Sequence, residues 1–216
     1  MPHSKSPCAE APHNDGLWQS KKTISFEDYL VLESLVFEWA DSYDAKDWAR
    51  LKSILAPDLL IDYTSIGKAC LWPKMSAAAF VKMVSSPNFL GNPCLETQHL
   101  LGARRYERVS DSRIIGYHQI RAAHQVYTTP ALEEVRHKGH VHASNVHYYA
   151  KVNGEWKFAG LKPTVRWSEH EFERVFRDIY EDMEMPAVDE GEVGEFRDEV
   201  LGSVAAGGQQ ILVEVH

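Results

Sequence analysis

The stretch RIIGYHQIRAAHQVY, residues 113–127, alternates in polarity along its length. Its even positions are mostly apolar, as at Ile114 and Ile120, whereas Gln119 and Arg121 occupy odd positions. Successive side chains of a β-strand point to opposite faces, so this pattern predicts a long strand with one buried face. The same alternation predicts that the imidazole of His124 points inward.

Two more strands are predicted after this one, at residues 139–151 and 155–161. Asn153-Gly154 separates them and is a strong hairpin signal, because both central residues of a type I′ turn need positive φ. One face of the first strand carries Val141, Ala143, Asn145 and His147. The other face carries His140, His142 and Ser144. An inward Asn145 is therefore expected in the same cavity as His124.

Helical periodicity precedes the strands. Ser25 is suited to cap a helix, with Asp28 three residues later as an approximate capping box. Apolar residues then recur at spacings of three and four: Tyr29, Leu32, Val36, Trp39, Ala40 and Tyr43. Further helices are predicted at residues 45–55, 76–84 and 168–180. Helices followed by long antiparallel strands predict an α+β fold, with a strongly curved sheet wrapped on the N-terminal helices.

Composition predicts one folded domain at residues 23–180. Residues 1–22 are expected to be a mobile lead-in, and residues 181–216 an acidic, flexible tail with ten acids and one base. The chain has no basic stripe for nucleic acid and no apolar run of the roughly 18 residues that a membrane helix needs. No secretory signal opens it, and its three cysteines are widely spaced. A reducing, cytoplasmic location is therefore expected.

Polar residues lie inside otherwise apolar stretches, where an unpartnered polar group is costly. They are Tyr43, Asp44, Tyr63, His99, His124 and Asn145. An imidazole with a pKa near 6.5 serves as acid or base, and a phenol donates to a carbonyl oxygen that becomes an enolate. Together these residues predict proton transfer on a carbonyl-bearing substrate without a cofactor. The alternative is a buried histidine and asparagine satisfied by backbone groups, with Tyr43 as a core aromatic.

Other chemistries find less support in the sequence. His140-x-His142 has the spacing of a metal pair on one strand face, but no carboxylate follows at the spacing of a cupin-type site. The chain has no G-x-S-x-G elbow, no G-x-G-x-x-G and no Walker loop. No metal and no nucleotide cofactor are therefore expected.

From about Ile24 to Phe176 the chain resembles the scytalone dehydratases of fungal melanin biosynthesis. The matching stretches are FEWADSYDAKDW, FVKMVSS, TQHLLG, IIGYHQIR, HQVY, KGHVH and WKFAGLKP. The resemblance implies a cone-shaped barrel of the NTF2-like type, usually a homotrimer. It implies loss of water from scytalone and vermelone without a cofactor, and it adds endosomes or pigment vesicles to the expected location.

The resemblance also assigns roles to residues. It implies that His99 and His124 are the catalytic histidines and that Asp44 is the helix aspartate. It implies that Tyr43 and Tyr63 bind the carbonyl. Substrate-binding residues of the family match Asn145, Ile66, Phe172 and Phe176.

Two departures from the family pattern bear on the substrate. Ala143 stands where the family has a serine, and the neighbouring Ser144 is expected to face away from the site. Ile66 stands where the family has an aromatic pocket residue. These changes raise the first of two alternatives, and the second is raised because NTF2-like cones also serve as ligand carriers. One is a dehydratase or decarboxylase acting on another aromatic polyketide in secondary metabolism. The other is a non-catalytic ligand-binding module of the NTF2-like type.

Overall fold

The computed structural model describes residues 23–66 and 70–175. The expected lead-in, the acidic tail and Phe176 lie outside the described residues. Among the residues it describes, no helix is both long and apolar enough to cross a membrane.

Three helices come before the long strands. Helix α1 (Phe26–Asp44) begins where the Ser25 hydroxyl accepts a hydrogen bond from the Asp28 amide at 3.1 Å, as the predicted cap requires. The buried face of α1 carries Leu32, Leu35, Val36, Trp39, Ala40, Ser42 and Tyr43. The shorter helices are α2 (Trp48–Ile54) and α3 (Ala77–Val84). These positions confirm the three N-terminal helices that the periodicity predicts.

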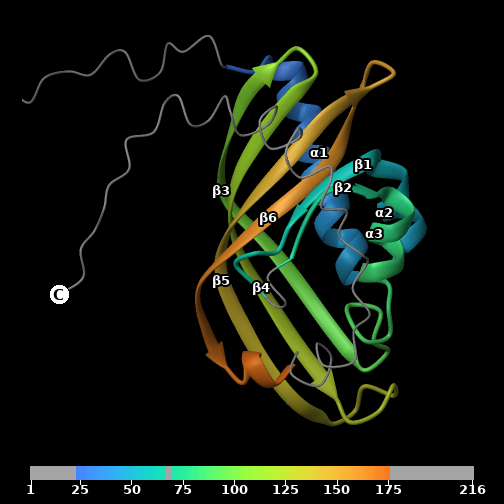
Figure 1. Ribbon diagram of the computed structural model, residues 1–216. Coiled ribbons are helices and arrows are strands. Elements are labelled where there is room, and N and C mark those ends of the chain that lie inside the picture. The colour runs from blue at the N-terminus through green and yellow to red at the C-terminus, as the bar shows by residue number, and fades with distance from the viewer. Residues whose placement is uncertain (1–22, 67–69, 176–216) are drawn as a thin grey trace, which may run out of the picture.

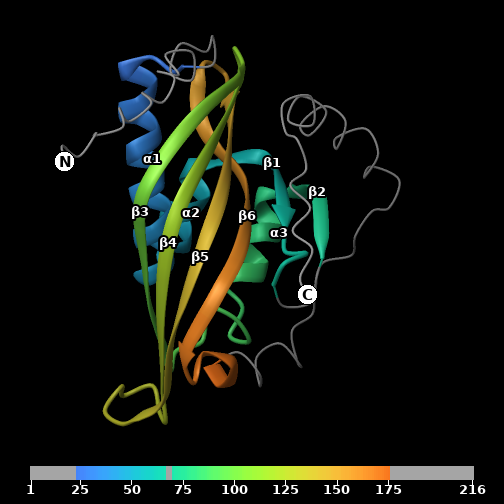
Figure 2. The same ribbon diagram turned by 90° about the vertical axis from the view of Figure 1, so that its left-hand side faces the viewer.

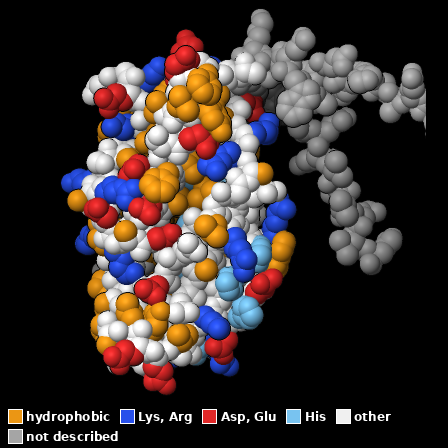
Figure 3. All heavy atoms as spheres, turned by 180° about the vertical axis from the view of Figure 1, so that it is seen from behind, with side chains coloured by type: hydrophobic (Ala, Val, Ile, Leu, Met, Phe, Trp, Pro, Cys, Tyr) orange, Lys and Arg blue, Asp and Glu red, His pale blue; other side chains and the backbone are white. Residues whose placement is uncertain are grey.

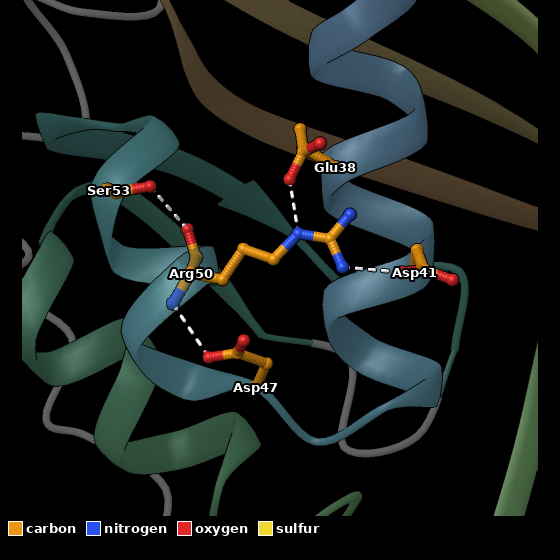
Figure 4. Close-up of polar contacts among 5 residues, drawn as sticks. All are labelled: Glu38, Asp41, Asp47, Arg50 and Ser53. Atoms are coloured by element: carbon orange, nitrogen blue, oxygen red, sulfur yellow. Dashed lines mark hydrogen bonds and ion pairs between the residues drawn. The ribbon is translucent and has the colours of Figure 1, made fainter.

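One arginine joins α2 to the outer side of α1. The Arg50 guanidinium forms ion pairs with Glu38 and Asp41 of α1, and its backbone N–H donates to the Asp47 carboxylate (Figure 4). Asp47 is also the N-cap of α2. The two helices are thus fixed relative to each other at the end of α1 that carries Tyr43 and Asp44.

Six strands form one mixed sheet in the order β2-β1-β6-β5-β4-β3. They are β1 (Leu55–Asp62), β2 (Leu71–Ser76), β3 (Leu95–Ser110), β4 (Arg113–Tyr127), β5 (Val135–Val152) and β6 (Glu155–His170). Only the β1–β6 pair is parallel within this sheet. The long strands β3 to β6 curve together, and the helices lie on their concave side (Figures 1 and 2). The structure therefore confirms the predicted α+β class and the curved, mostly antiparallel sheet.

The predicted strand at residues 113–127 is observed with the same bounds as β4, and Asn153 and Gly154 both have positive φ in the turn between β5 and β6. The prediction of a helix from Ser168 is wrong. Strand β6 continues to His170, because the long β5 still offers partners there, with Val141 opposite Ser168. Within the predicted helix at residues 168–180, residues 172–175 do have helical backbone, and residues 176–180 lie outside the described residues.

The alternation along β4 and β5 places one row of each strand in the interior. On β5 the buried residues include Val141, Ala143, Asn145 and His147, as predicted, and on β4 they include His118 and His124. This inner face and helix α1 together surround the cavity described next.

Candidate active site

A cavity of about 460 Å³ lies between helix α1 and the concave face of the sheet. Its walls come from α1, the segment after β1, the segment between α3 and β3, strands β3 to β6 and the turn at residues 171–175. The predicted site residues that line it are Tyr43, Tyr63, Ile66, His99, His124, Asn145 and Phe172. Residues as distant in the chain as Tyr43 and Phe172 are thus brought together in one mostly apolar cavity.

Asp44 does not line this cavity, but its carboxylate hydrogen-bonds to His99, which does. Its Oδ1 lies 2.7 Å from His99 Nδ1, its Oδ2 accepts the His99 backbone N–H at 2.8 Å, and the Thr97 hydroxyl donates to Oδ1 at 2.8 Å. Burial raises the pKa of the Asp44 carboxyl, but the bonds from His99 and Thr97 outweigh burial and hold this pKa below its usual value. Because an ionised carboxylate only accepts, Nδ1 of His99 carries the hydrogen. In the neutral ring, Nε2 of His99 then holds the lone pair that can accept a proton.

His124 is the second imidazole of the cavity. Its ring centroid lies 5.9 Å from that of His99 and 5.3 Å from the ring of Phe172. Burial, and then the positive charge available on His99, lowers the pKa of His124 to about 3. His124 is therefore neutral near pH 7.

The phenol of Tyr43 faces the same cavity from α1. Burial, followed by repulsion from Tyr63, raises the pKa of Tyr43 well above 10, so the phenol stays protonated and remains a donor. The Tyr43 ring lies 4.9 Å from Trp39 and 5.6 Å from His99. Tyr63 also lines the cavity, and its ring centroid lies 6.2 Å from that of Trp72. Donors so placed can stabilise a developing oxyanion.

Asn145 is 2% exposed and contributes an amide. Its Nδ2 lies 3.1 Å from Nε2 of His147, and its Oδ1 has no hydrogen-bond partner within the described residues. Ala143, next on the same face, also lines the cavity, whereas Ser144 pairs with Gln119 and lies on the other face of the sheet. The described geometry therefore places no serine hydroxyl at the family position.

Sequence reasoning missed part of the apolar wall. Trp39 lies one helical turn before Tyr43 in the same apolar stripe, so the periodicity contained the signal for it. Pro163 and Val165 line the cavity from the part of β6 beyond Leu161, where the predicted strand ended. A prediction that stops the strand at Leu161 has no reason to place these residues in the site.

The pair His140 and His142 lies on the outer face of β5. The His142 ring stacks on Trp167 at 4.5 Å, and Nδ1 of His140 lies 3.1 Å from the Arg121 guanidinium. Across residues 23–66 and 70–175, no group of three or more His, Cys, Asp or Glu side chains is arranged to hold a metal ion.

Known proteins share much of this sequence. The family model for scytalone dehydratase matches residues 23–183. Scytalone dehydratase arp1 of Aspergillus fumigatus is 58% identical over 155 residues, which are 72% of this chain and 92% of that protein. Scytalone dehydratase of Pyricularia oryzae is 52% identical over 160 residues, 74% of this chain and 92% of that protein.

Among solved structures, hexachlorocyclohexane dehydrochlorinase LinA type 2 matches with a TM-score of 0.51 and 18% identity, over 67% of this chain and 88% of that one. This likeness concerns the fold alone and confirms the expected cone-shaped α+β architecture of the NTF2-like type. The family match spans most of the chain and therefore shows the family as well as the fold. The chain belongs to the scytalone dehydratase family.

Proposed function

We propose that this protein is a hydro-lyase that removes water from scytalone, and likewise from vermelone, to give hydroxynaphthalenes in the biosynthesis of dihydroxynaphthalene melanin. The observation that carries the proposal is the Asp44–His99 pair, which presents an imidazole base to a buried cavity that also holds two phenols. The names of relatives that are more than half identical support the same substrate. The chemistry needs only proton transfers, so we propose that no cofactor takes part.

In the first step, Nε2 of His99 takes a proton from the carbon next to the substrate ketone. The C–H bonding electrons move to the carbonyl oxygen, which becomes an enolate. Tyr43 and Tyr63 donate to this oxygen, directly or through a bound water, and stabilise its charge. The carboxylate of Asp44 stabilises the imidazolium that forms on His99.

In the second step, the enolate electrons return and expel the hydroxyl from the neighbouring carbon. The protonated His99 gives its proton to this hydroxyl, which leaves as water, and tautomerisation yields the aromatic ring. His124 is neutral and hydrogen-bonds to the leaving hydroxyl, because its low pKa makes it a poor store for a proton. Each proton-transfer role contributes roughly 10² to 10⁴ in rate.

The alternative substrate is another aromatic polyketide, dehydrated or decarboxylated by the same residues. Ala143 and Ile66 favour it, because both line the cavity and both are smaller than the family residues at these positions. A non-catalytic ligand-binding module is disfavoured, because a carrier has no need of an imidazole held by a carboxylate.

We further propose a homotrimer in the cytoplasm, or at endosomes or pigment vesicles, with residues 23–180 as the folded domain. Support for self-association comes from the outer face of the sheet, where Leu100 and Trp167 are 54% and 51% exposed. These residues, with Arg121 and His142, border a shallow hollow. On the side of the molecule that Figure 3 shows, which is seen from behind relative to Figure 1, acidic and basic side chains are intermixed, a pattern that suits a protein partner better than nucleic acid. Light scattering on the purified full chain tests the trimer, and a monomer at micromolar concentration would contradict it.

The test of the reaction is turnover of purified protein with scytalone and with vermelone, followed by absorbance with and without EDTA. We expect rapid formation of the hydroxynaphthalene that EDTA does not slow. A well-folded protein that turns over neither compound would exclude this substrate and favour the other polyketide.

A further inference from the structure

A buried histidine that the proposed mechanism does not use lies directly behind Asn145. His147 is 0% exposed, and its ring packs against Trp39 at 4.7 Å and Phe158 at 5.1 Å. Its Nε2 lies 3.1 Å from Asn145 Nδ2 and its Nδ1 lies 3.2 Å from the phenol oxygen of Tyr149. Because the three residues are spaced by two along β5, they form one row from the cavity into the core.

Both groups behind Asn145 are uncharged. Burial, and then repulsion from His118 and Arg104, lowers the pKa of His147 well below 6.5. Burial, and then Tyr106, raises the pKa of Tyr149 well above 10. A neutral imidazole has one N–H donor and one lone pair. With the amide nitrogen of Asn145 facing Nε2, that ring nitrogen accepts, and Nδ1 carries the hydrogen and donates to the Tyr149 oxygen.

The side-chain oxygen of Asn145, at the other end of the amide, bears on which ligands the cavity binds. Its Oδ1 is buried and has no hydrogen-bond partner within the described residues, although Asn145 lines the cavity. A buried carbonyl oxygen without a donor is unfavourable, so a ligand that supplies an O–H at this point gains affinity. An ether or carbonyl oxygen there would meet another acceptor.

We propose that His147 is a positioning residue that fixes the Asn145 amide with its oxygen toward the ligand, so that the site selects a ring hydroxyl at this point. The inference rests on the proposed function only in its choice of a hydroxylated ring as the ligand. The orientation of Asn145 does not depend on turnover.

The experiment compares three variants and two probes. His147→Leu removes the acceptor for Asn145, whereas His147→Gln returns an amide oxygen near the position of Nε2. His118→Leu is the matched control, because the His118 ring is 2% exposed, lies 4.4 Å from His147, and has no hydrogen bond at either nitrogen within the described residues. The probes are naphthalene-1,3-diol and 1,3-dimethoxynaphthalene, with binding measured by calorimetry on the full chain and folding by thermal melting.

We expect His147→Leu to weaken binding of the diol about tenfold and of the dimethyl ether less than twofold. His147→Gln should restore diol binding to within threefold of wild type, and His118→Leu should change neither probe. With scytalone, His147→Leu should raise KM with kcat changed less than threefold.

Equal losses for both probes, or no loss for either, would overturn the proposal. Should His147→Leu fail to fold, His147→Asn replaces it, because the shorter amide reaches toward Tyr149 but not toward Asn145. It should then bind the diol more weakly than His147→Gln, and equal binding would overturn the proposal. Since the probes need no turnover, an enzyme inactive on scytalone that shows the expected binding contradicts the proposed function and leaves this inference standing.

Discussion

Nδ1 of His99 lies 2.7 Å from Oδ1 of Asp44, although His99 belongs to β3 and Asp44 is the last residue of α1. Asp44→Asn should lower turnover of scytalone by roughly 10² to 10⁴, because an amide no longer stabilises the imidazolium on His99. Steady-state kinetics measure the effect. Asp41→Asn is the control, since Asp41 contacts Arg50 on the outer side of α1. Loss of activity in both variants to the same extent would contradict a special role for Asp44.

Stability should fall in mild acid because three histidines are buried in neutral form: His118, His124 and His147. Burial lowers the pKa of His118 to about 4 and that of His124 to about 3. Above pH 6.5 these rings are neutral in both states. Below it the unfolded chain takes up protons that the folded chain does not, so the free energy of unfolding decreases until the folded pKa values are reached.

The expected loss between pH 7.5 and 5.5 is about 1.4 kcal/mol for each of the three rings, or roughly 4 kcal/mol in all. Denaturant unfolding at the two pH values measures it. His118→Leu should remove about a third of the difference. Equal stability of the wild type at both pH values would show that these rings are already protonated or exposed.

Gly139 permits the turn at residues 171–175 to close the cavity. A Cβ at Gly139 would lie 2.3 Å from the backbone nitrogen of Phe172, so Gly139→Ala must displace the turn and move the Phe172 ring away from His124. We expect KM for the substrate to rise about tenfold or more. Gly102→Ala is the matched control, because its Cβ would meet its nearest neighbour, Gln119, at 3.6 Å. Unchanged KM in Gly139→Ala would contradict the closing role of this turn.

Ile66 should widen the range of ligands. Ile66→Phe restores an aromatic ring to the cavity wall and reduces its volume. We expect this variant to keep its affinity for bicyclic naphthols within threefold and to bind tricyclic phenols several-fold more weakly, as measured by calorimetry. A wild-type protein that binds no tricyclic phenol would argue against the larger polyketide as substrate.

Much of the fold could be predicted from the alternation of apolar and polar residues in the strands and from the helical spacing of apolar residues. The bounds of β4 and the buried row of β5 could be predicted, because one buried face imposes a strict period of two. The length of β6 could not be predicted, since Pro163 interrupts the strand pattern within it. Their pairing depends on the length of β5, which is a tertiary property.

For the candidate site, the inward direction of His124 and Asn145 followed from strand position alone. The contact of Asp44 with His99 did not, because it depends on how α1 lies across β3. Asn145 and His147 could be predicted on one face of the strand, and Tyr149 follows His147 two residues later. Only the distances between their polar atoms reveal a hydrogen-bonded chain.

The central claim is that His99 moves the proton in a dehydration, and His99→Asn tests it most directly. The rate of scytalone dehydration by this variant should be measured beside its affinity for naphthalene-1,3-diol. We predict a fall in kcat of roughly 10² to 10⁴, with diol affinity within threefold of the wild type. A folded His99→Asn variant that keeps more than a tenth of the wild-type rate would contradict the claim.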